Sequence, residues 1–200
     1  SSAFMAPRTV LRSVLSEMHR VVDVCGEICE LGILDGQDVF YIAKVESQDP
    51  IRIVSQVGMR LPACCTATGK ALLADFSEED LHRLYGDTLP TVTAHSLTSF
   101  SELASQLQAI REGHLARGLR ESSREATSYA LPLRFRGSVA ASISVSVPLF
   151  RMSEEKEEVV GRELRKAKSK IEALMESRGE CIVPLNRSGK NISGTCAPRI

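Results

Sequence analysis

The sequence has no tryptophan, its aromatic residues amount to only 4%, and neither sign of charge is in excess. The 25 Lys and Arg residues are balanced by 25 Asp and Glu residues, so the formal net charge is zero. A chain that binds nucleic acid or an anionic membrane surface by itself needs a surplus of cations. The composition therefore argues against direct DNA binding by this chain and against a polybasic membrane-surface protein.

Long apolar runs are also missing. No uncharged apolar stretch approaches the roughly 20 residues that a bilayer-spanning helix requires. Residues 1–7 lack the basic start and the apolar run of a signal peptide. We therefore expect a cytoplasmic protein with no membrane partner. Its 200 residues suffice for a domain whose core needs no metal or disulfide.

The cysteines and histidines lack the spacing of known metal or catalytic motifs. Six cysteines occur without a Cys-x-x-Cys pair, although Cys25 and Cys29 are close enough in sequence to share a ligand. The four histidines fall in different predicted elements, and none neighbours a Ser or Cys in a nucleophile motif. We expect reduced structural thiols, no metal, no cofactor and no enzymatic activity.

Hydrophobic spacing predicts a long helix near each end of the chain. Between Val10 and Cys25, apolar residues recur at steps of three and four, and Gly26 is placed to end that helix. The stretch 153–177 carries a similar stripe, whose predicted core positions are Val160, Leu164, Ala167, Ile171 and Leu174. Shorter helices are predicted at 66–74, 77–85 and 99–112.

Strand-like segments lie between these helices. Their residue types and turn signals predict strands at 28–34, 39–45, 51–57, 126–134 and 138–147. Asp35-Gly36 and Arg136-Gly137 each separate two of these strands and indicate hairpins. Together with the helices, the strands predict an α+β fold with a largely antiparallel sheet.

Residues 138–147 alternate between small, mostly hydroxyl-bearing side chains and apolar ones. One face of this predicted strand carries Ser138, Ala140, Ser142, Ser144 and Ser146, and the other carries Val139, Ala141, Ile143, Val145 and Val147. The preceding strand repeats the pattern, with Ala126, Ser128 and Ala130 alternating against Thr127, Tyr129 and Leu131. Small hydroxyl side chains suit the floor of a pocket for a small polar ligand. A close-packed contact with a helix, or a solvent-facing surface, would give the same pattern.

The segment from Leu61 to Lys70 superficially suggests a phosphate-binding loop. The pattern G-x-x-x-x-G-K-[ST] is absent, because one Gly precedes Lys70 and Ala71 stands where a magnesium-binding hydroxyl is needed. A helix that begins near Thr66 would still expose backbone N–H groups that can hold a carboxylate. An ordinary capped helix explains the segment equally well.

Several short motifs occur in a characteristic order along the chain. They are Gly26-Glu27, Leu34-Asp35-Gly36, Val45-Glu46, Val57-Gly58-x-Arg60-Leu61-Pro62, Thr66-Ala-x-Gly-Lys-Ala-Leu-Leu-Ala74 and Ala140-x-x-Ile-Ser-Val-Ser146. In this order they resemble the effector-binding domain of the isocitrate-lyase-regulator (IclR) family of bacterial transcription regulators. The resemblance implies a GAF-like α+β domain with a curved, mostly antiparallel sheet flanked by helices.

The resemblance also implies partners. Such regulators bind a small metabolite, often a carboxylate, and work as a dimer or a dimer of dimers. They contact operator DNA through an N-terminal winged helix-turn-helix that this sequence lacks. The match covers 8–177, which leaves 1–7 as a linker remnant and 178–200, rich in Gly, Ser, Asn and Pro, as a poorly ordered tail. The start without Met suggests a fragment of a longer protein.

Carried across residue by residue, the resemblance assigns a ligand site. The assigned residues are Ala67 and Thr68 at the helix start, Ser128, Ser144 and Ser146 on the sheet, and Glu121 as the acidic contact. The family commonly has His where this chain has Cys64. The segment from Arg120 to Pro132 also departs from the family pattern, and its Arg120 and Arg124 could pair with an anionic ligand.

Two other functions fit the same fold. One is a GAF-like sensor of a cyclic nucleotide or of a chromophore attached to Cys, which absorbance of the purified protein would reveal. The other is a small hydrolase with Ser128 or Cys64 as nucleophile, which a covalent probe would reveal.

Overall fold

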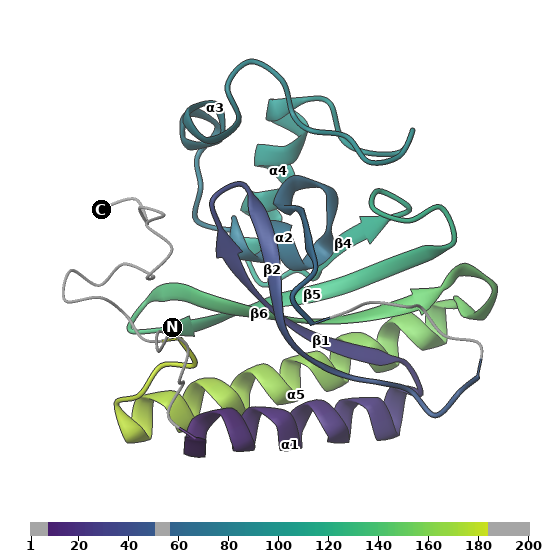
Figure 1. The fold of residues 1–200 in the computed structure, drawn as a ribbon, viewed down its shortest axis with the longest axis vertical. Coiled ribbons are helices and arrows are strands. Elements are labelled where there is room, and N and C mark those ends of the chain that lie inside the picture. The colour runs from purple at the N-terminus through teal and green to yellow at the C-terminus, as the bar shows by residue number, and fades with distance from the viewer. Residues whose placement is uncertain (1–7, 51–56, 184–200) are drawn as a thin grey trace.

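In the part of the chain that the structure describes, six antiparallel strands form one curled sheet in the order β3-β2-β1-β6-β5-β4. The protein is described by a computed structural model that covers residues 8–50 and 57–183 (Figure 1). Its elements are α1 (Arg8–Cys25), β1 (Ile28–Asp35), β2 (Asp38–Val45), β3 (Arg60–Pro62), the 3-10 turn η1 (Ala63–Cys65), α2 (Ala67–Leu72), α3 (Glu78–Tyr85), α4 (Phe100–Arg111), β4 (Ala116–Leu119), β5 (Ala126–Phe135), β6 (Ser138–Pro148), the 3-10 turn η2 (Leu149–Arg151) and α5 (Glu154–Arg178). The predicted α+β class, with long helices at both ends, is confirmed.

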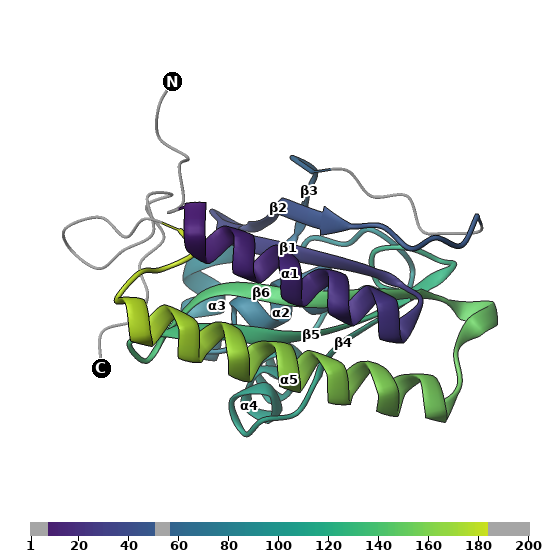
Figure 2. The same cartoon turned by 90° about the horizontal axis from the view of Figure 1, so that it is seen from below.

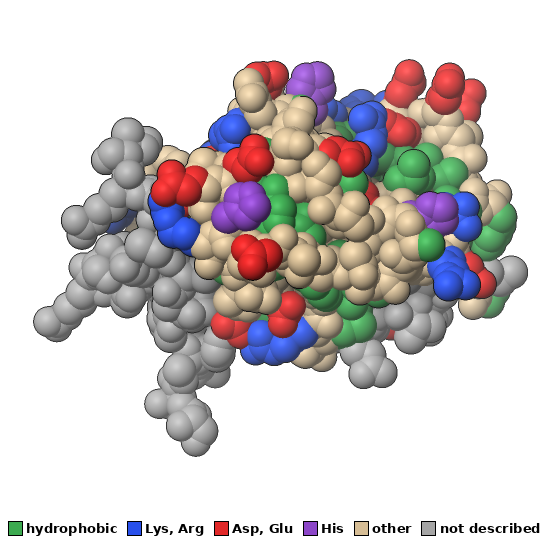
Figure 3. Space-filling view, turned by 90° about the horizontal axis from the view of Figure 1, so that it is seen from above, with side chains coloured by type: hydrophobic (Ala, Val, Ile, Leu, Met, Phe, Trp, Pro, Cys, Tyr) green, Lys and Arg blue, Asp and Glu red, His purple; other side chains and the backbone are tan. Residues whose placement is uncertain are grey.

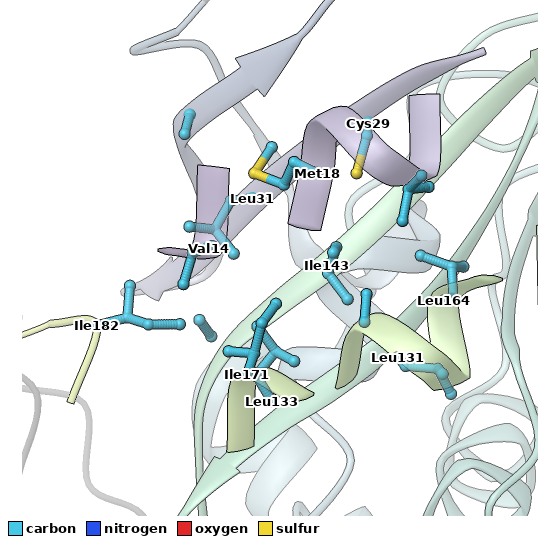
Figure 4. Close-up of a cluster of buried hydrophobic side chains, with 14 of the residues drawn as sticks. Val14, Met18, Cys29, Leu31, Leu131, Leu133, Ile143, Leu164, Ile171 and Ile182 are labelled. Carbon is cyan, nitrogen blue, oxygen red and sulfur yellow. The ribbon is translucent and has the colours of Figure 1, made fainter. Parts of the chain in front are cut away.

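The two long helices cover one face of the sheet. Figures 1 and 2 show α1 and α5 side by side beneath it, and α2, α3 and α4 on the opposite side. The predicted stripe of α1 is buried here, since Val10, Val14 and Met18 have no exposed surface. Figure 4 shows how side chains from α1, α5, the strands and the segment after α5 meet in this core, among them Val14, Met18, Cys29, Leu31, Leu131, Leu133, Ile143, Leu164, Ile171 and Ile182.

Both predicted hairpins are confirmed. β1 and β2 pair from Asp35 and Asp38 outward, and Gly36 in their turn has φ +63°. β5 and β6 join through Arg136 and Gly137, whose φ values of 51° and 81° are both positive. A two-residue turn with both φ values positive matches the right-handed twist of the strands that it connects.

A β-bulge between Leu133 and Arg134 changes which residues of early β6 face which side. Leu133 pairs with Ala141 and Arg134 pairs with Val139, so the register skips Ala140. Because a bulge shifts the alternation by one residue, Ala140 joins the core beneath the sheet and Val139 packs above it. The predicted faces are wrong for these two residues, while Ile143, Val145 and Val147 lie beneath the sheet as predicted.

Other differences from the prediction concern element boundaries. The third strand was expected at 51–57; residues 51–56 lie outside the described part, Val57 is in a turn, and the strand that follows is β3. The helix expected at 66–74 is shorter, and η1 precedes it. The bounds of β4 were not predicted from the sequence.

At the C-terminal end, Leu174 is half-buried and Met175 occupies the core position instead. A strict 4-3-4-3 spacing drifts around a helix of 3.6 residues per turn, so one longer step restores the buried face. Cys181, Ile182 and Val183 are buried in the core, which extends the packed region past residue 177. The remainder of the expected tail, 184–200, lies outside the described residues.

Candidate functional site

A pocket of about 680 Å³ opens on the face of the sheet that carries α2. Its lining comes from strands on both sides of the sheet centre, from the connection between β4 and β5, and from η2. The lining residues are Glu30, Tyr41, Met59, Leu61, Thr66, Gly118, Ser122, Ser123, Arg124, Glu125, Ala126, Thr127, Ser128, Ser146, Pro148, Leu149 and Phe150. A volume of this size lies within the ~300–1,000 Å³ typical of small-molecule sites.

Hydroxyl groups and the Glu30 carboxylate lie together in this pocket. Ser128 and Ser146 are direct partners in the β5–β6 register, so their side chains are neighbours on one face. The Ser146 hydroxyl donates to Glu30 Oε2 at 3.2 Å. Glu30 is 4% exposed, which makes it a buried acceptor at the edge of the pocket. This part of the lining therefore offers both hydrogen-bond donors and an acceptor to a guest.

The start of α2 stands close behind the pocket wall. Thr66 is the N-cap of α2 and accepts a hydrogen bond from Gly69 N at 2.8 Å through its side chain. A Cβ on Gly118 would lie 2.6 Å from Ser128 Oγ and 2.8 Å from Ala67 N. Glycine at position 118 therefore allows α2, β4 and β5 to meet this closely.

Three of the predicted site residues form the packed contact between α2 and the sheet. Thr68 donates to Ser144 Oγ at 2.9 Å, and Tyr41 donates to Thr68 Oγ1 at 3.4 Å. Thr68, Ser144 and the neighbouring Ala67 are buried, and none of them lines the pocket. Burial, with a contribution from the charge of Glu30, raises the pKa of Tyr41, so its hydroxyl remains a donor.

The serine stripe of β6 thus divides between two environments. Ser142 and Ser144 are fully buried in the contact with α2, whereas Ser146 is half-buried and lines the pocket. Pocket and packed contact, which sequence analysis treated as alternatives, occur on the same strand. Ser128 and Ser146 are brought together in the pocket, and Ala67, Thr68 and Ser144 lie behind it.

Glu121 also lies behind the pocket wall. Its carboxylate accepts a hydrogen bond from Lys70 Nζ at 2.7 Å, and both side chains are buried. Burial raises the pKa of Glu121, although the nearby Lys70 ammonium opposes that effect. The next residues along the chain, 122–125, line the pocket. Of the two arginines considered as anion partners, Arg124 lines the pocket and Arg120 does not.

Glu30, Tyr41 and Phe150 line the pocket but were not among the predicted site residues. Glu30 had a visible signal, because it is an acidic residue within the apolar strand Ile28–Asp35. A buried acid in a strand needs a polar environment, and the facing serines provide one. Phe150 had no comparable signal, since its place at the pocket follows from η2.

The candidate nucleophiles show no catalytic arrangement in the described part of the chain. The sulfur atoms of Cys64 and Cys65 are 3.8 Å apart. The hydrogen bond with Cys65 and burial both raise the pKa of the Cys64 thiol. The described residues lining the pocket include no histidine that would activate Ser128.

Over the described residues, no group of three or more His, Cys, Asp or Glu side chains could hold a metal ion. No described helix is long and apolar enough to cross a bilayer.

Charges of both signs are mixed on the face over α3 and α4. Figure 3 shows the face over α3 and α4, where Lys and Arg side chains are interspersed with Asp and Glu. A protein surface that binds DNA gathers cations on one face or along one helix. The visible face lacks such a gathering.

Curated proteins similar in sequence are regulators of transcription. "Probable transcriptional regulator SauR" of Cupriavidus necator is 36% identical over 138 residues, which are 68% of this chain and 55% of SauR. The regulator KdgR of Escherichia coli is 32% identical over 168 residues, which are 83% of this chain and 64% of KdgR. The chain thus spans less than two thirds of the length of these relatives.

Solved structures of related regulators share the fold. The C-terminal domain of Escherichia coli KdgR superposes with a TM-score of 0.72 at 30% identity, over 83% of this chain and 98% of that domain. An IclR homologue from Microbacterium hydrocarbonoxydans, solved with 4-hydroxybenzoate, gives a TM-score of 0.73 at 24% identity, over 84% and 69% of the two chains. The family model for the bacterial transcriptional regulator IclR C-terminal domain matches residues 4–173. The chain belongs to this family.

Proposed function

We propose that the pocket between β1, β6, β5 and η2 binds a small organic acid, and that this chain is the ligand-sensing part of a cytoplasmic, DNA-binding transcription regulator. The pocket itself carries the proposal, because it combines a volume of about 680 Å³ with convergent polar groups. The regulatory relatives support the same function.

The chemistry of the lining indicates which acids to test first. Glu30 can accept a hydrogen bond from a ligand hydroxyl, beside the hydroxyls of Ser128 and Ser146. Arg124 places a guanidinium at the exposed rim, where it can pair with a carboxylate. A compact acid that also bears a hydroxyl could place its hydroxyl beside Glu30 and the serines and its carboxylate beside Arg124. The 4-hydroxybenzoate bound by the Microbacterium hydrocarbonoxydans homologue has these two groups.

Ligand binding would act on DNA through a change in population. A metabolite that binds one arrangement of a homodimer, or of a dimer of dimers, more tightly than another shifts the equilibrium towards that arrangement. DNA contact would come from a winged helix-turn-helix domain joined to this domain in the whole regulator. The neutral charge of this chain is consistent with DNA binding by another part of the protein.

A thermal-shift screen of small organic acids, with 4-hydroxybenzoate among them, tests the proposal. Because a ligand of the native state alone stabilises it by RT ln(1 + [L]/Kd), a true effector at a hundred times its Kd adds about 2.7 kcal/mol. Hits are then measured by calorimetry. A screen in which none of these acids raises the melting temperature would contradict the proposed ligand class.

The substitution Ser146→Leu tests whether the ligand binds in this pocket. The larger side chain fills part of the cavity, so we expect ligand affinity to fall at least tenfold while the melting temperature of the free protein stays near that of the wild type. Ser138→Leu is the matched control, because Ser138 is exposed at the other end of the same strand. Unchanged affinity in Ser146→Leu would place the ligand elsewhere.

A further inference from the structure

A lysine with no exposed surface lies directly behind the pocket. Lys70 belongs to the short helix α2, and its side chain is among the largest that are fully buried in the described structure. A buried ammonium is costly unless its three donors are satisfied by good acceptors. Lys70 meets this requirement with three different acceptors on three different parts of the chain.

Each of the three hydrogen bonds from Lys70 reaches a separate segment. Its Nζ donates to Gln106 Oε1 of α4 at 2.8 Å, to the carbonyl of Arg117 in β4 at 3.0 Å, and to Glu121 Oε1 at 2.7 Å. Gly118, next to Arg117, lines the pocket, and so do residues 122–125, which follow Glu121. Lys70 is therefore hydrogen-bonded to the residue that precedes each of the two lining segments, Gly118 and residues 122–125.

Hydroxyl groups hold the same connection from the other side. Ser96 donates to the carbonyl of Glu121 at 2.8 Å, and Thr93 donates to the carbonyl of Arg120 at 2.7 Å. Arg120 itself has φ 59°, a left-handed conformation that few residues other than glycine adopt without support from their surroundings. The backbone leading into the pocket wall is thus held in an unusual shape by contacts behind it.

The ion pair between Lys70 and Glu121 is poorly explained by stability alone. Glu121 Oε2 is buried and has no hydrogen-bond partner among the described residues, so the carboxylate is only partly satisfied. Buried ion pairs often add nothing to stability compared with apolar residues of similar volume. This pair is costly to bury, and its hydrogen bonds are incomplete. Lys70 is nevertheless bonded to the segments that flank the pocket wall, which is consistent with a role in shaping that wall.

We propose that Lys70 is a positioning residue, which through Arg117 and Glu121 holds the β4–β5 wall of the pocket in its ligand-ready shape. The expected effect on ligand affinity rests on the proposed function. The claim that Lys70 holds the backbone of 117–125 in place does not, because it applies to the protein without ligand. Lys70 and Glu121 do not line the pocket, so their effect on a ligand would pass through the backbone of 117–125.

Hydrogen exchange measured by mass spectrometry tests the claim about the backbone. The double variant Lys70→Met with Glu121→Gln removes both charges together, which avoids leaving one of them buried and unpaired. We expect exchange in peptides covering 117–127 to become at least tenfold faster, while peptides from α1 and α5 keep wild-type rates. Lys168→Met is the matched control, because Lys168 likewise joins a carbonyl, that of Pro132, to a carboxylate, that of Glu172, but belongs to α5.

Each outcome of the exchange experiment decides the matter. Unchanged exchange over 117–127 would overturn the proposal, and so would a uniform acceleration across the chain, since that would make the pair a general structural contact. Acceleration of the same segment in Lys168→Met would overturn it as well. Calorimetry with 4-hydroxybenzoate as the probe supplies the second readout, with an expected loss of affinity of at least tenfold in the double variant. If the wild type does not bind this acid, the proposed ligand class loses support, and the exchange data still decide the role of Lys70.

Discussion

The two faces of the sheet are made by the same strands, yet they differ in what covers them. Beneath the sheet, apolar side chains of β1, β5 and β6 pack against α1 and α5 into a continuous core (Figure 4). Above it, α2 packs partly on serines, and beyond α2 the same face opens into a pocket. Along β6, residues that pack in the core therefore alternate with residues that face α2 or the pocket. Substitutions along β6 should accordingly alternate between large and small effects on the free energy of unfolding.

The largest effect is expected beneath the sheet, from Ile143→Ala. Ile143 has no exposed surface and lies in the centre of the core in Figure 4. The loss of its buried methyl and methylene groups leaves a cavity, which costs about 2–5 kcal/mol. Urea denaturation measures this free energy of unfolding. A cost below about 1 kcal/mol would mean that the helix-covered face is loosely packed, and the contrast between the two faces would fail.

An intermediate effect on the free energy of unfolding is expected from Glu163→Gln, which removes a buried charge from α5, one of the two helices that cover the sheet. Although burial raises the pKa of Glu163, hydrogen bonds from Lys166, Arg20 and Arg162 outweigh that effect and lower the pKa to about 2, from an ordinary value of 4.5. Arg20 belongs to α1, so the cluster joins the two long helices. We expect Glu163→Gln to cost roughly 1 kcal/mol near neutral pH, because the partners of Glu163 are partly exposed to solvent.

The pH dependence of Glu163→Gln has a definite sign. A carboxylate with a lowered folded-state pKa stabilises the protein above its unfolded pKa and loses that contribution as the pH falls towards the folded value. The difference in stability between wild type and variant should therefore be constant near neutral pH and should shrink as the pH falls from 4.5 to about 2. Urea denaturation at a series of pH values measures it. A difference that does not vary with pH would remove the ionic explanation.

The smallest effect is expected from Ser142→Ala, one residue before Ile143 and on the opposite face. Ser142 is fully buried, and its hydroxyl has no hydrogen-bond partner among the described residues. Removing an unsatisfied buried hydroxyl relieves its desolvation cost, so the change should be within about 0.5 kcal/mol of neutral or slightly stabilising. The same denaturation experiment compares Ser142→Ala with Ile143→Ala directly. A loss larger than about 1 kcal/mol would reveal a partner for this hydroxyl.

Much of the fold could be predicted because it depends on residues close together in sequence. The stripe from Val10 to Cys25 determines the buried side of α1, and Arg136-Gly137 determines a turn with two positive φ values. Continued without a shift, the register at that turn would pair Ser128 with Val145, so Ser128 lies opposite Ser146 only because the bulge shifts the register by one residue. The bulge after Leu133 escaped prediction, since nothing local in the sequence indicates where the register skips a residue.

The candidate site was harder to predict because its parts are distant in sequence. Lys70 and Glu121 are 51 residues apart, and their pairing follows from the path of the chain over the sheet. Local reasoning could exclude a phosphate loop around Lys70, but it had no means of locating the acceptors that make its burial tolerable. Thr68 and Ser144 lie 76 residues apart, and their hydrogen bond decides that this part of the serine stripe packs against a helix.

The turn at Arg136 and Gly137 has a consequence at the other end of its hairpin. Because side chains alternate along paired strands, a slip of one residue between β5 and β6 would exchange the two faces of the slipped strand. Slippage of β6 would direct Ser146 towards α5 and Val145 towards the cavity. The two-residue loop and the one-residue bulge after Leu133 thus together determine which chemical groups a guest molecule meets some ten residues away, without touching that molecule.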